Sequence, residues 1–163
     1  MQPIIRQYED RDRAGLMKCL EDLQDHEAAL DPIKHVVRKD GFGEPYTAWI
    51  LETVANEDGI IYVVEDNDAV VGFIACGIKH NEKQELLARS NNKPYGHTYE
   101  LYVADAYRSQ GVGAQLMEKV ESYFREKGCE LASVYAIASN TRAWDFYKKN
   151  GYFDRYINLI KKI

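Results

Sequence analysis

The pattern of apolar and polar residues in the first part of the chain predicts one strand followed by two helices. Residues 4–8 form a short apolar run that is typical of a strand. Across residues 13–26 the apolar side chains recur every three or four positions, the spacing of one buried helix face: Leu16, Cys19, Leu20 and Leu23. Asp31 and Pro32 break this pattern. A second helix is predicted over residues 47–56, with Ile50, Leu51 and Val54 facing inward.

The middle of the chain has the pattern of paired strands. Two apolar runs, residues 60–64 and 70–78, are joined by the acidic turn at residues 65–68 and predict a β-hairpin. Residues 79–96 are polar and predict a connection with little regular structure. Residues 97–103 predict the strand that follows it.

The most regular pattern lies in the second half of the chain. A helix is predicted from Gly111 by apolar residues at four-residue steps, namely Val112, Leu116, Val120 and Phe124, and Gly128 ends it. Residues 131–136 indicate a strand, and a helix capped by Asn140 or Thr141 follows and ends at Gly151. Residues 152–160 are expected to supply one or two closing strands.

Together these elements predict an α/β (α+β) fold in a single domain over residues 1–163. The expected sheet is mixed, mostly antiparallel, of about six to seven strands, and is flanked by about four helices.

Composition and charge exclude several classes of function. A net charge of −5 argues against nucleic acid as a partner, because binding to a phosphate backbone requires a basic face. No apolar run is long enough to span a bilayer, and the first residues lack the pattern of a secretory leader, so a cytoplasmic protein that does not bind membranes is expected. The three cysteines have no paired spacing, which argues against a disulfide framework and a zinc site, so no metal is expected.

The turn before the Gly111 helix is a candidate anion site. A strand that enters a glycine-containing turn and then a helix places unpaired backbone N–H groups and the positive end of the helix dipole together. Neither common nucleotide motif fits: Leu116 stands where a dinucleotide fingerprint needs its third glycine, and Gly113 is followed by Ala114 and Gln115 rather than Lys and Ser or Thr.

The segment Arg108-x-x-Gly111-x-Gly113 resembles the pyrophosphate-binding signature of the GNAT superfamily of acyl-CoA-dependent N-acyltransferases, Arg/Gln-x-x-Gly-x-Gly/Ala. Two further features of that family occur in the expected order within residues 99–152, one before this segment and one after it. The strand Glu100-Leu-Tyr-Val103 resembles the one that carries the family's general base. The later segment, from Asn140 through the Phe146-Tyr147 pair to Gly151, resembles its closing helix.

The resemblance implies a binding site for acetyl-CoA as co-substrate. Backbone N–H groups of residues 108–114 would hold the pyrophosphate, and a backbone N–H near Tyr102 or Val103 would bind the thioester carbonyl. Asn140 would bind the pantetheine arm, although the same residue also fits a helix N-cap. The implied cofactor-binding residues are Tyr102, Val103, Arg108, Ser109, Gln110, Gly111, Val112, Gly113, Ala114, Asn140 and Tyr147.

Two side chains are candidates for proton transfer. The resemblance implies that Glu100 removes a proton from the substrate ammonium, directly or through water, and strand alternation places Glu100 and Tyr102 on one face. His97 and Tyr99 are alternative bases. Tyr147 matches the family position for a phenol that protonates the leaving thiolate, although a Phe-Tyr pair also suits a helix that packs on a sheet.

The sequence therefore predicts an N-acetyltransferase that moves an acetyl group from acetyl-CoA to a primary amine by direct attack in a ternary complex. A small cationic acceptor is expected near the first two helices, where acidic residues gather: Asp25, Glu27, Asp31 and Glu44. Two alternatives remain open, a non-catalytic CoA-binding sensor or scaffold and an acetyltransferase acting on a protein or peptide amine. Members of the family are often dimers, so the resemblance allows a homodimer with the tyrosine-rich C-terminus at its interface.

Overall fold

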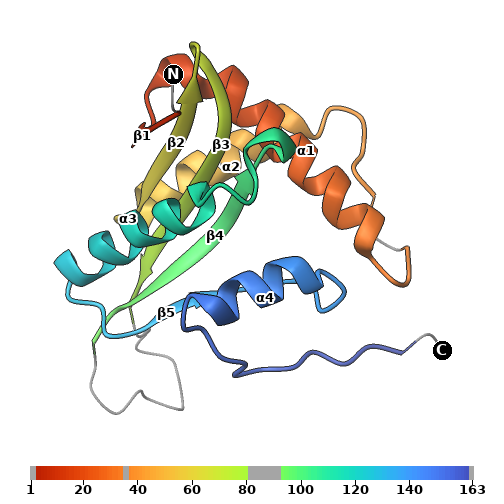
Figure 1. Cartoon of the computed structure of the whole chain (residues 1–163), viewed down its shortest axis with the longest axis vertical. Coiled ribbons are helices and arrows are strands. Elements are labelled where there is room, and N and C mark those ends of the chain that lie inside the picture. Colours follow the sequence, from red (N-terminus) through yellow and green to blue (C-terminus); the bar gives the residue numbers. More distant parts are fainter. Residues whose placement is uncertain (1–2, 35–36, 81–92, 162–163) are drawn as a thin grey trace.

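One twisted sheet runs through the computed structural model, which describes residues 3–34, 37–80 and 93–161 (Figure 1). The described strands lie in the order β1-β2-β3-β4-β5, and β5 is the one that runs parallel to its neighbour. Their bounds are β1 Ile4–Gln7, β2 Ile60–Asp66, β3 Ala69–Lys79, β4 Tyr95–Val103 and β5 Ala132–Val134. The hairpin formed by β2 and β3 confirms the prediction for the middle of the chain, and its turn residues Asn67 and Asp68 both have positive φ.

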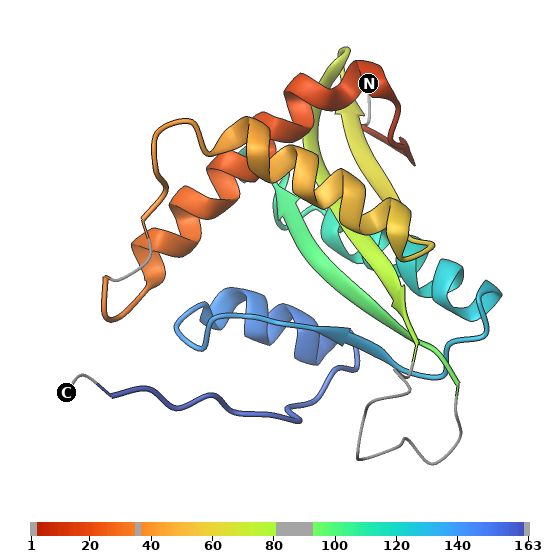
Figure 2. The same cartoon turned by 180° about the vertical axis from the view of Figure 1, so that it is seen from behind.

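Helices cover both faces of this sheet. Helices α1 (Arg13–Leu30) and α2 (Gly43–Asn56) pack together on one face, as Figure 2 shows, and α3 (Val112–Glu126) packs on the other. Helix α4 (Thr141–Lys149) lies beside β5. Two short 3-10 turns, η1 (Asp10–Asp12) and η2 (Asp105–Tyr107), precede α1 and α3. No helix in the described ranges is both long and apolar enough to cross a membrane.

Two hydrophobic clusters fill the two sides of the sheet. The cluster beneath α1 and α2 contains the four predicted α1 residues and Ile50 and Val54 of α2, all buried. The cluster beneath α3 contains the residues predicted at four-residue steps: Val112, Leu116, Val120 and Phe124. Gly128 follows α3 with φ 75°, the left-handed conformation that ends a helix. The periodicity in the sequence therefore identified the buried faces correctly.

Helix α2 begins four residues earlier than the sequence pattern predicts, at Gly43. Pro45 lies in its first turn, where the missing N–H of proline removes no bond within the helix. This early start brings Tyr46 onto the helix.

The sheet has an irregularity in β4 that bears on function. In the pairing of β3 with β4, Ala75 lies opposite Glu100 and Cys76 lies opposite Thr98, so Tyr99 is an extra residue. Such a bulge turns two successive side chains to the same side of the sheet. Both Tyr99 and Glu100 accordingly contact side chains of α2, namely Trp49 and Tyr46.

Strands β4 and β5 separate soon after they meet. Their pairing runs from Gly96 opposite Ala132 to Thr98 opposite Val134. The predicted strand over residues 131–136 is therefore shorter than expected, and β4 continues to Val103 without a described strand on that side.

The predictions of six to seven strands and of closing strands within residues 152–160 are wrong for the described residues, although the α/β class is correct. Five strands are present, and residues 152–161 have no regular secondary structure. A strand requires a neighbour that completes its hydrogen bonds, and no described segment offers this one a ladder. Of the connection predicted over residues 79–96, residues 81–92 lie outside the described residues.

Candidate active site

The turn before α3 has the geometry of an anion site. Gly111 is the N-cap of α3 with φ 82°, Ser109 has φ 62°, and no side chain caps the helix. The first N–H groups of a helix have no acceptor within it, so those at residues 111–114 are available to a ligand at the positive end of the dipole. The position of Gly111 in the left-handed region explains why glycine is needed there.

The side chain of Arg108 braces this turn. Its Nε donates to the carbonyl of Val103 at 2.6 Å, its guanidinium forms an ion pair with Asp105, and it lies over the ring of Tyr102 at 5.6 Å. Its backbone N–H donates to the carbonyl of Asp105 at 3.3 Å. Arg108 therefore ties the end of β4 to the turn, a structural task that the family pattern by itself does not reveal.

The remaining residues of the predicted pyrophosphate loop have distinct environments. Gln110 bonds the carbonyl of Ala106 at 2.7 Å, and Ser109 accepts from Arg142 of α4 at 3.3 Å. Val112, the first residue of α3, is buried, whereas Ala114 is exposed. A Cβ on Gly113 would lie 3.4 Å from the ring of Phe146, which is close to an ordinary contact distance.

The carboxyl group of Glu100 lies in a partly buried position beside α2. It lies on the part of β4 beyond the bulge, facing α2, and it accepts a hydrogen bond from the hydroxyl of Tyr46. The pKa of Glu100 is raised to about 7. Burial is the largest cause and raises it, the hydrogen bond from Tyr46 lowers it, and the charge of Glu27 raises it. A carboxylate with a pKa near neutrality can both accept and release a proton at physiological pH.

Glu27 and Tyr147 belong to the same electrostatic cluster as Glu100. Burial raises the pKa of Glu27 on α1. Burial also raises the pKa of Tyr147 on α4, and the charges of Glu100 and Glu27 raise it further. The charge of Glu100 thus acts on Tyr147, and the charge of Glu27 acts on both groups. The phenol of Tyr147 is therefore protonated at neutral pH.

The separation of β4 from β5 explains how this cluster forms across the sheet. Tyr147 packs with the cluster on the α3 side of the sheet, whereas Glu100 contacts α2 on the other side. With β5 diverging after Val134, no described strand separates the two side chains.

Asn140 takes the helix-capping role that the sequence left open. Its side-chain oxygen accepts from the backbone N–H of Ala143 at 3.1 Å, which caps α4. This bond holds the start of the helix that carries Phe146 and Tyr147. The two rings lie 5.3 Å apart, and Tyr147 also lies 5.8 Å from Tyr152.

The alternative bases occupy other networks. His97 is buried, its Nδ1 lies 2.8 Å from the hydroxyl of Ser133, and burial lowers its pKa. Tyr99 donates a hydrogen bond to Glu57, which also pairs with Lys79. These contacts favour Glu100 over both residues as the base.

Of the four acidic residues expected near the acceptor, Glu27 alone shows coupling to Glu100 within the described residues. Asp25 pairs with Arg38 at 2.8 Å and Glu44 pairs with Arg13. Asp31 is buried and accepts from the backbone N–H of Ile33 at 3.1 Å in the turn after α1.

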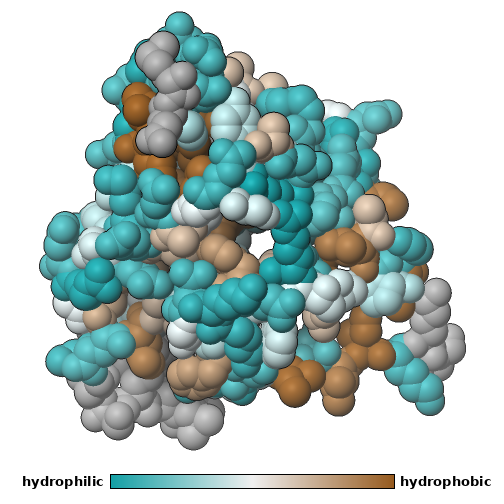
Figure 3. All heavy atoms as spheres, in the orientation of Figure 1, coloured by the Kyte–Doolittle hydropathy of each residue, from teal (hydrophilic) through white to brown (hydrophobic). Residues whose placement is uncertain are grey.

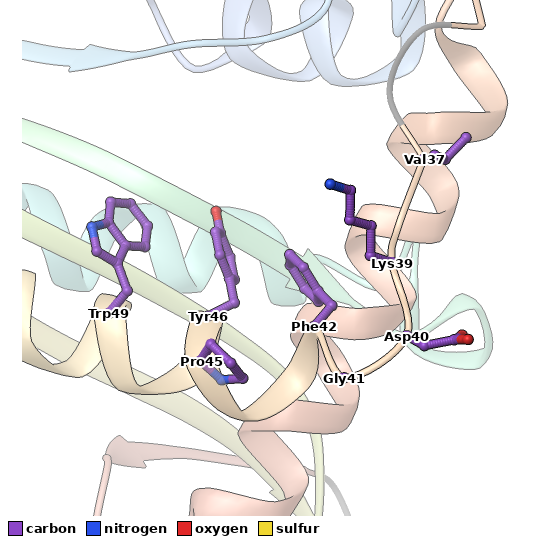
Figure 4. A pocket seen from close by; sticks show the side chains of 8 residues that line it. All are labelled: Val37, Lys39, Asp40, Gly41, Phe42, Pro45, Tyr46 and Trp49. Carbon is purple, nitrogen blue, oxygen red and sulfur yellow. The ribbon is translucent and has the colours of Figure 1, made fainter.

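Sequence reasoning missed Tyr46 and the aromatic row to which it belongs. Phe42, Tyr46 and Trp49 project from α2 toward β4 (Figure 4). The ring centres of Phe42 and Tyr46 lie 4.6 Å apart, and those of Tyr46 and Trp49 lie 5.1 Å apart. Their spacing of four and three residues is a helical signal in the sequence, but the prediction that α2 starts at residue 47 concealed it.

A cavity of about 410 Å³ opens along this row. The residues that line it come from the segment before α2 and from its first turns: Val37, Lys39, Asp40, Gly41, Phe42, Pro45, Tyr46 and Trp49 (Figure 4). Tyr46 joins the cavity to Glu100 through its hydroxyl. Among the residues that the structure describes, no group of three His, Cys, Asp or Glu side chains is arranged to hold a metal ion.

The model of the acetyltransferase (GNAT) family matches residues 20–152, most of the chain. The chain belongs to the acetyltransferase (GNAT) family. This match covers the turn before α3, Glu100, Tyr147 and the last helix, and it confirms the resemblance drawn from the sequence motifs. It also supports the prediction of an acetyl-transferring enzyme.

Individual relatives agree with this assignment. An uncharacterised N-acetyltransferase of Methanocaldococcus jannaschii is 26% identical over 138 residues, which are 80% of this chain and 56% of that protein. The chain thus spans little more than half of that archaeal relative's length. A thialysine N-epsilon-acetyltransferase of Bos taurus is 26% identical over 152 residues, 91% of this chain and 82% of that protein.

A solved structure shows the same fold. A mutant of the BH1408 protein from Bacillus halodurans superimposes with a TM-score of 0.80 over 98% of this chain and 99% of that one, at 18% identity.

Proposed function

We propose that this GNAT protein transfers an acetyl group from acetyl-CoA to a primary amine of a small cationic acceptor. The observation that carries the proposal is the setting of Glu100, which accepts a hydrogen bond from Tyr46, has a pKa raised to about 7 and is coupled electrostatically to the protonated Tyr147. A base for the amine and an acid for the thiolate are the two proton-transfer groups that aminolysis of a thioester uses. The family match supports acetyl-CoA as the donor.

The uncapped start of α3 is the proposed site for the CoA pyrophosphate. The N–H groups of residues 111–114 would bind it, and the family resemblance assigns the thioester to the end of β4 near Tyr102 and Val103. The split between β4 and β5 then leads from this turn toward Glu100 and Tyr147. Donor and acceptor would enter from opposite faces of the sheet, which favours a ternary complex.

The acceptor is proposed to lie against the aromatic row of α2. Carboxylates at Glu27 and Glu100 attract a cation, and the faces of Tyr46 and Trp49 add cation–π attraction. The bovine relative is named for the N-epsilon amine of thialysine, which supports a flexible lysine-like amine as the first acceptor to test.

The proposed reaction proceeds without an acyl-enzyme. Glu100 takes a proton from the substrate ammonium, and the free amine attacks the thioester carbonyl carbon to form the C–N bond. The attacking nitrogen then loses its second proton to water, the tetrahedral intermediate collapses with cleavage of the C–S bond, and Tyr147 gives its phenolic proton to the leaving thiolate. Proton exchange with solvent then restores Tyr147 and Glu100.

Binding of the donor is tested by thermal unfolding with acetyl-CoA, CoA or NAD. At about 100 times its dissociation constant a ligand adds about 2.7 kcal/mol of stability, which raises the melting temperature of a domain of this size by several degrees. A rise with both CoA compounds and none with NAD is expected. The same experiment with no rise for either CoA compound contradicts the proposed donor.

Catalysis is tested by thiol release with a panel of thialysine, lysine, a polyamine, an aminoglycoside and a lysine-containing peptide. Glu100→Gln and Tyr147→Phe should retain CoA binding and reduce kcat by about 100-fold or more, the usual contribution of acid–base catalysis. Glu118→Gln and Tyr123→Phe on α3 provide matched controls that should keep the full rate.

The outcomes of this panel separate the competing functions. No turnover with any amine, together with CoA binding, would establish the non-catalytic sensor. Turnover restricted to the peptide would favour a protein or peptide acceptor. A stable radioactive acetyl-enzyme formed without acceptor would exclude direct transfer.

A further inference from the structure

The cavity along α2, where the acceptor is proposed to lie, carries charges of opposite sign at its two ends. Lys39 lies in its wall just before α2, and Tyr46 lies in the first turn of the helix. The hydroxyl of Tyr46 donates to Glu100, and the charge of Glu27 acts on the same carboxyl group. A molecule that fills the cavity therefore meets an ammonium group at one end and the Glu100 carboxyl group at the other.

Figure 4 shows the direction of the Lys39 side chain. Its ammonium group projects to the same side of α2 as the rings of Phe42 and Tyr46, and Phe42 stands between the other two. The carboxylate of Asp40, the next residue in the chain, points away from this row. The acid nearest in sequence therefore does not lie between Lys39 and the cavity.

No described carboxylate neutralises Lys39. Two other cations around the start of α2 are paired, Arg38 with Asp25 at 2.8 Å and Arg13 with Glu44. Lys39 has no hydrogen bond or ion pair with any residue of the ranges 3–34, 37–80 and 93–161. A flexible ammonium group of this kind can turn toward an opposite charge on a ligand.

The wall between the two charged ends is aromatic. The ring centres of Phe42 and Tyr46 lie 4.6 Å apart, and Trp49 extends the row. Apolar ring faces suit a methylene chain, which makes van der Waals contact with them and needs no hydrogen bonds there. The cavity thus fits a ligand that has a charged group at each end and an apolar chain between them.

The positive charge of Lys39 discriminates between classes of acceptor. A polyamine or an aminoglycoside would place a second ammonium group beside Lys39 and meet a like charge, which lowers its affinity. A carboxylate at the same place would form an ion pair with Lys39. In a lysine-containing peptide an uncharged amide replaces that carboxylate, so a peptide would lack this contact.

We propose that the acceptor is an ω-amino acid, in which a flexible methylene chain joins the primary amine to a carboxylate that Lys39 binds. This inference rests on the proposed function, because it takes the cavity along α2 as the acceptor site. The amine end lies beside Tyr46 and Glu100, where proton transfer is proposed, and the carboxylate end lies beside Lys39. Lys39 is then a specificity-determining residue that holds the acceptor by the end opposite to the reacting nitrogen.

The proposed donor site leaves this cavity open to the acceptor. In Figure 3, which looks onto the α3 face, an opening lies between the turn before α3 and α4. That turn is the proposed site of the CoA pyrophosphate. The residues around Lys39 instead accompany α2, which covers the other face of the sheet (Figure 2). The CoA pyrophosphate and the carboxylate of the acceptor are thus assigned to different sides of the sheet.

The first test measures binding of the carboxylate without any transfer step. The probes are 6-aminohexanoate and 6-aminohexanamide, which share one amine and one chain and differ in the charge of the far end. Each is titrated into ¹⁵N-labelled protein in the presence of CoA, and the dissociation constant is taken from the amide chemical shifts. The acid should shift residues 37–49 and bind about 5-fold more tightly than the amide, as an ion pair at an exposed lysine allows.

Two variants show whether Lys39 causes this preference. Lys39→Gln should bind both probes equally, because it removes the charge and keeps a polar side chain. Lys119→Gln is the matched control, since Lys119 is an exposed lysine on α3 outside the cavity, and it should keep the preference for the acid. The proposal is overturned if the unmodified protein binds the acid no better than the amide, if the preference survives in Lys39→Gln, or if Lys119→Gln loses it as well.

The second test measures acetyl transfer to 6-aminohexanoate and to 1,6-diaminohexane by thiol release. The unmodified protein should prefer the acid in kcat/KM per amine, and Lys39→Glu should reverse this preference through KM, a change in the ratio of about 25-fold. Transfer to the diamine as fast as to the acid would refute the ω-amino acid and leave the acetyltransferase intact. Selective binding of the acid with no transfer to any amine would refute the acetyltransferase and leave the Lys39 site intact.

Discussion

Replacing Tyr46 by phenylalanine should shift the pH at which Glu100 becomes a base. The hydroxyl of Tyr46 donates to the Glu100 carboxylate and lowers its pKa, against the burial that raises it to about 7. A hydrogen bond to a charged group contributes about 1.5–3 kcal/mol, and one pKa unit corresponds to about 1.36 kcal/mol, so the pKa should rise by about one to two units. At pH 7 the ionised fraction of Glu100 would fall about 5-fold to 50-fold.

The assay is kcat/KM for the acceptor between pH 5 and 10, measured by thiol release with one amine. The rate falls as pH drops below the pKa of the base, so this acid limb should move to higher pH in Tyr46→Phe and the rate should recover at high pH. The ionisation of the amine contributes equally to every variant. Tyr107→Phe is the control, since it removes a comparable hydrogen bond of 2.7 Å to Asp66 outside the cluster. An acid limb that stays in place in Tyr46→Phe would refute the assignment of Glu100 as the base.

Three further predictions follow from the same structure. Glu27→Gln removes the charge that raises the pKa of Glu100, so the acid limb should shift to lower pH, and an upward shift would contradict the coupling. Because the folded state binds a proton at Glu100 more tightly than the unfolded state does, stability should fall as pH rises from about 4.5 to 7, by on the order of 3 kcal/mol. The free energy of unfolding, measured with urea at pH 5 and pH 8, should not show this loss in Glu100→Gln. A loss in the variant equal to that of the unmodified protein would show that another group causes it. A Cβ at Gly96 would overlap the ring of Phe124, so Gly96→Ala should lower the free energy of unfolding by about 1–3 kcal/mol. Adding Phe124→Leu should recover part of this loss. No recovery in the double variant would show that the clash with Phe124 is not the cause.

The sequence predicted best those features that depend on neighbouring residues. The four-residue spacing in α3 identified its buried face, and the glycine at position 111 identified the turn before it. Alternation along β4 correctly placed Glu100 with Tyr102 and opposite Leu101, because all three lie beyond the bulge and share one uninterrupted register. Local rules suffice where the chain itself supplies the geometry.

The same rules failed where a feature depends on a distant partner. Strand alternation would place Tyr99 on the face opposite Glu100, whereas the bulge turns both toward α2. Residues 152–160 have strand composition, but composition does not supply the neighbouring strand that a ladder needs.

The electrostatic cluster shows this dependence most clearly. Glu27, Tyr46 and Glu100 come from α1, α2 and β4, and each residue alone has an ordinary sequence environment. Their properties depend on the bulge in β4 and the early start of α2, which bring Tyr46 and Glu100 together in a partly buried place. Burial is the largest cause of the raised pKa of Glu100, and burial is a property of the assembled fold. A motif in the sequence can therefore identify the carboxylate on β4, whereas the raised pKa on which its proposed role as a base depends is decided by elements far from it in the chain.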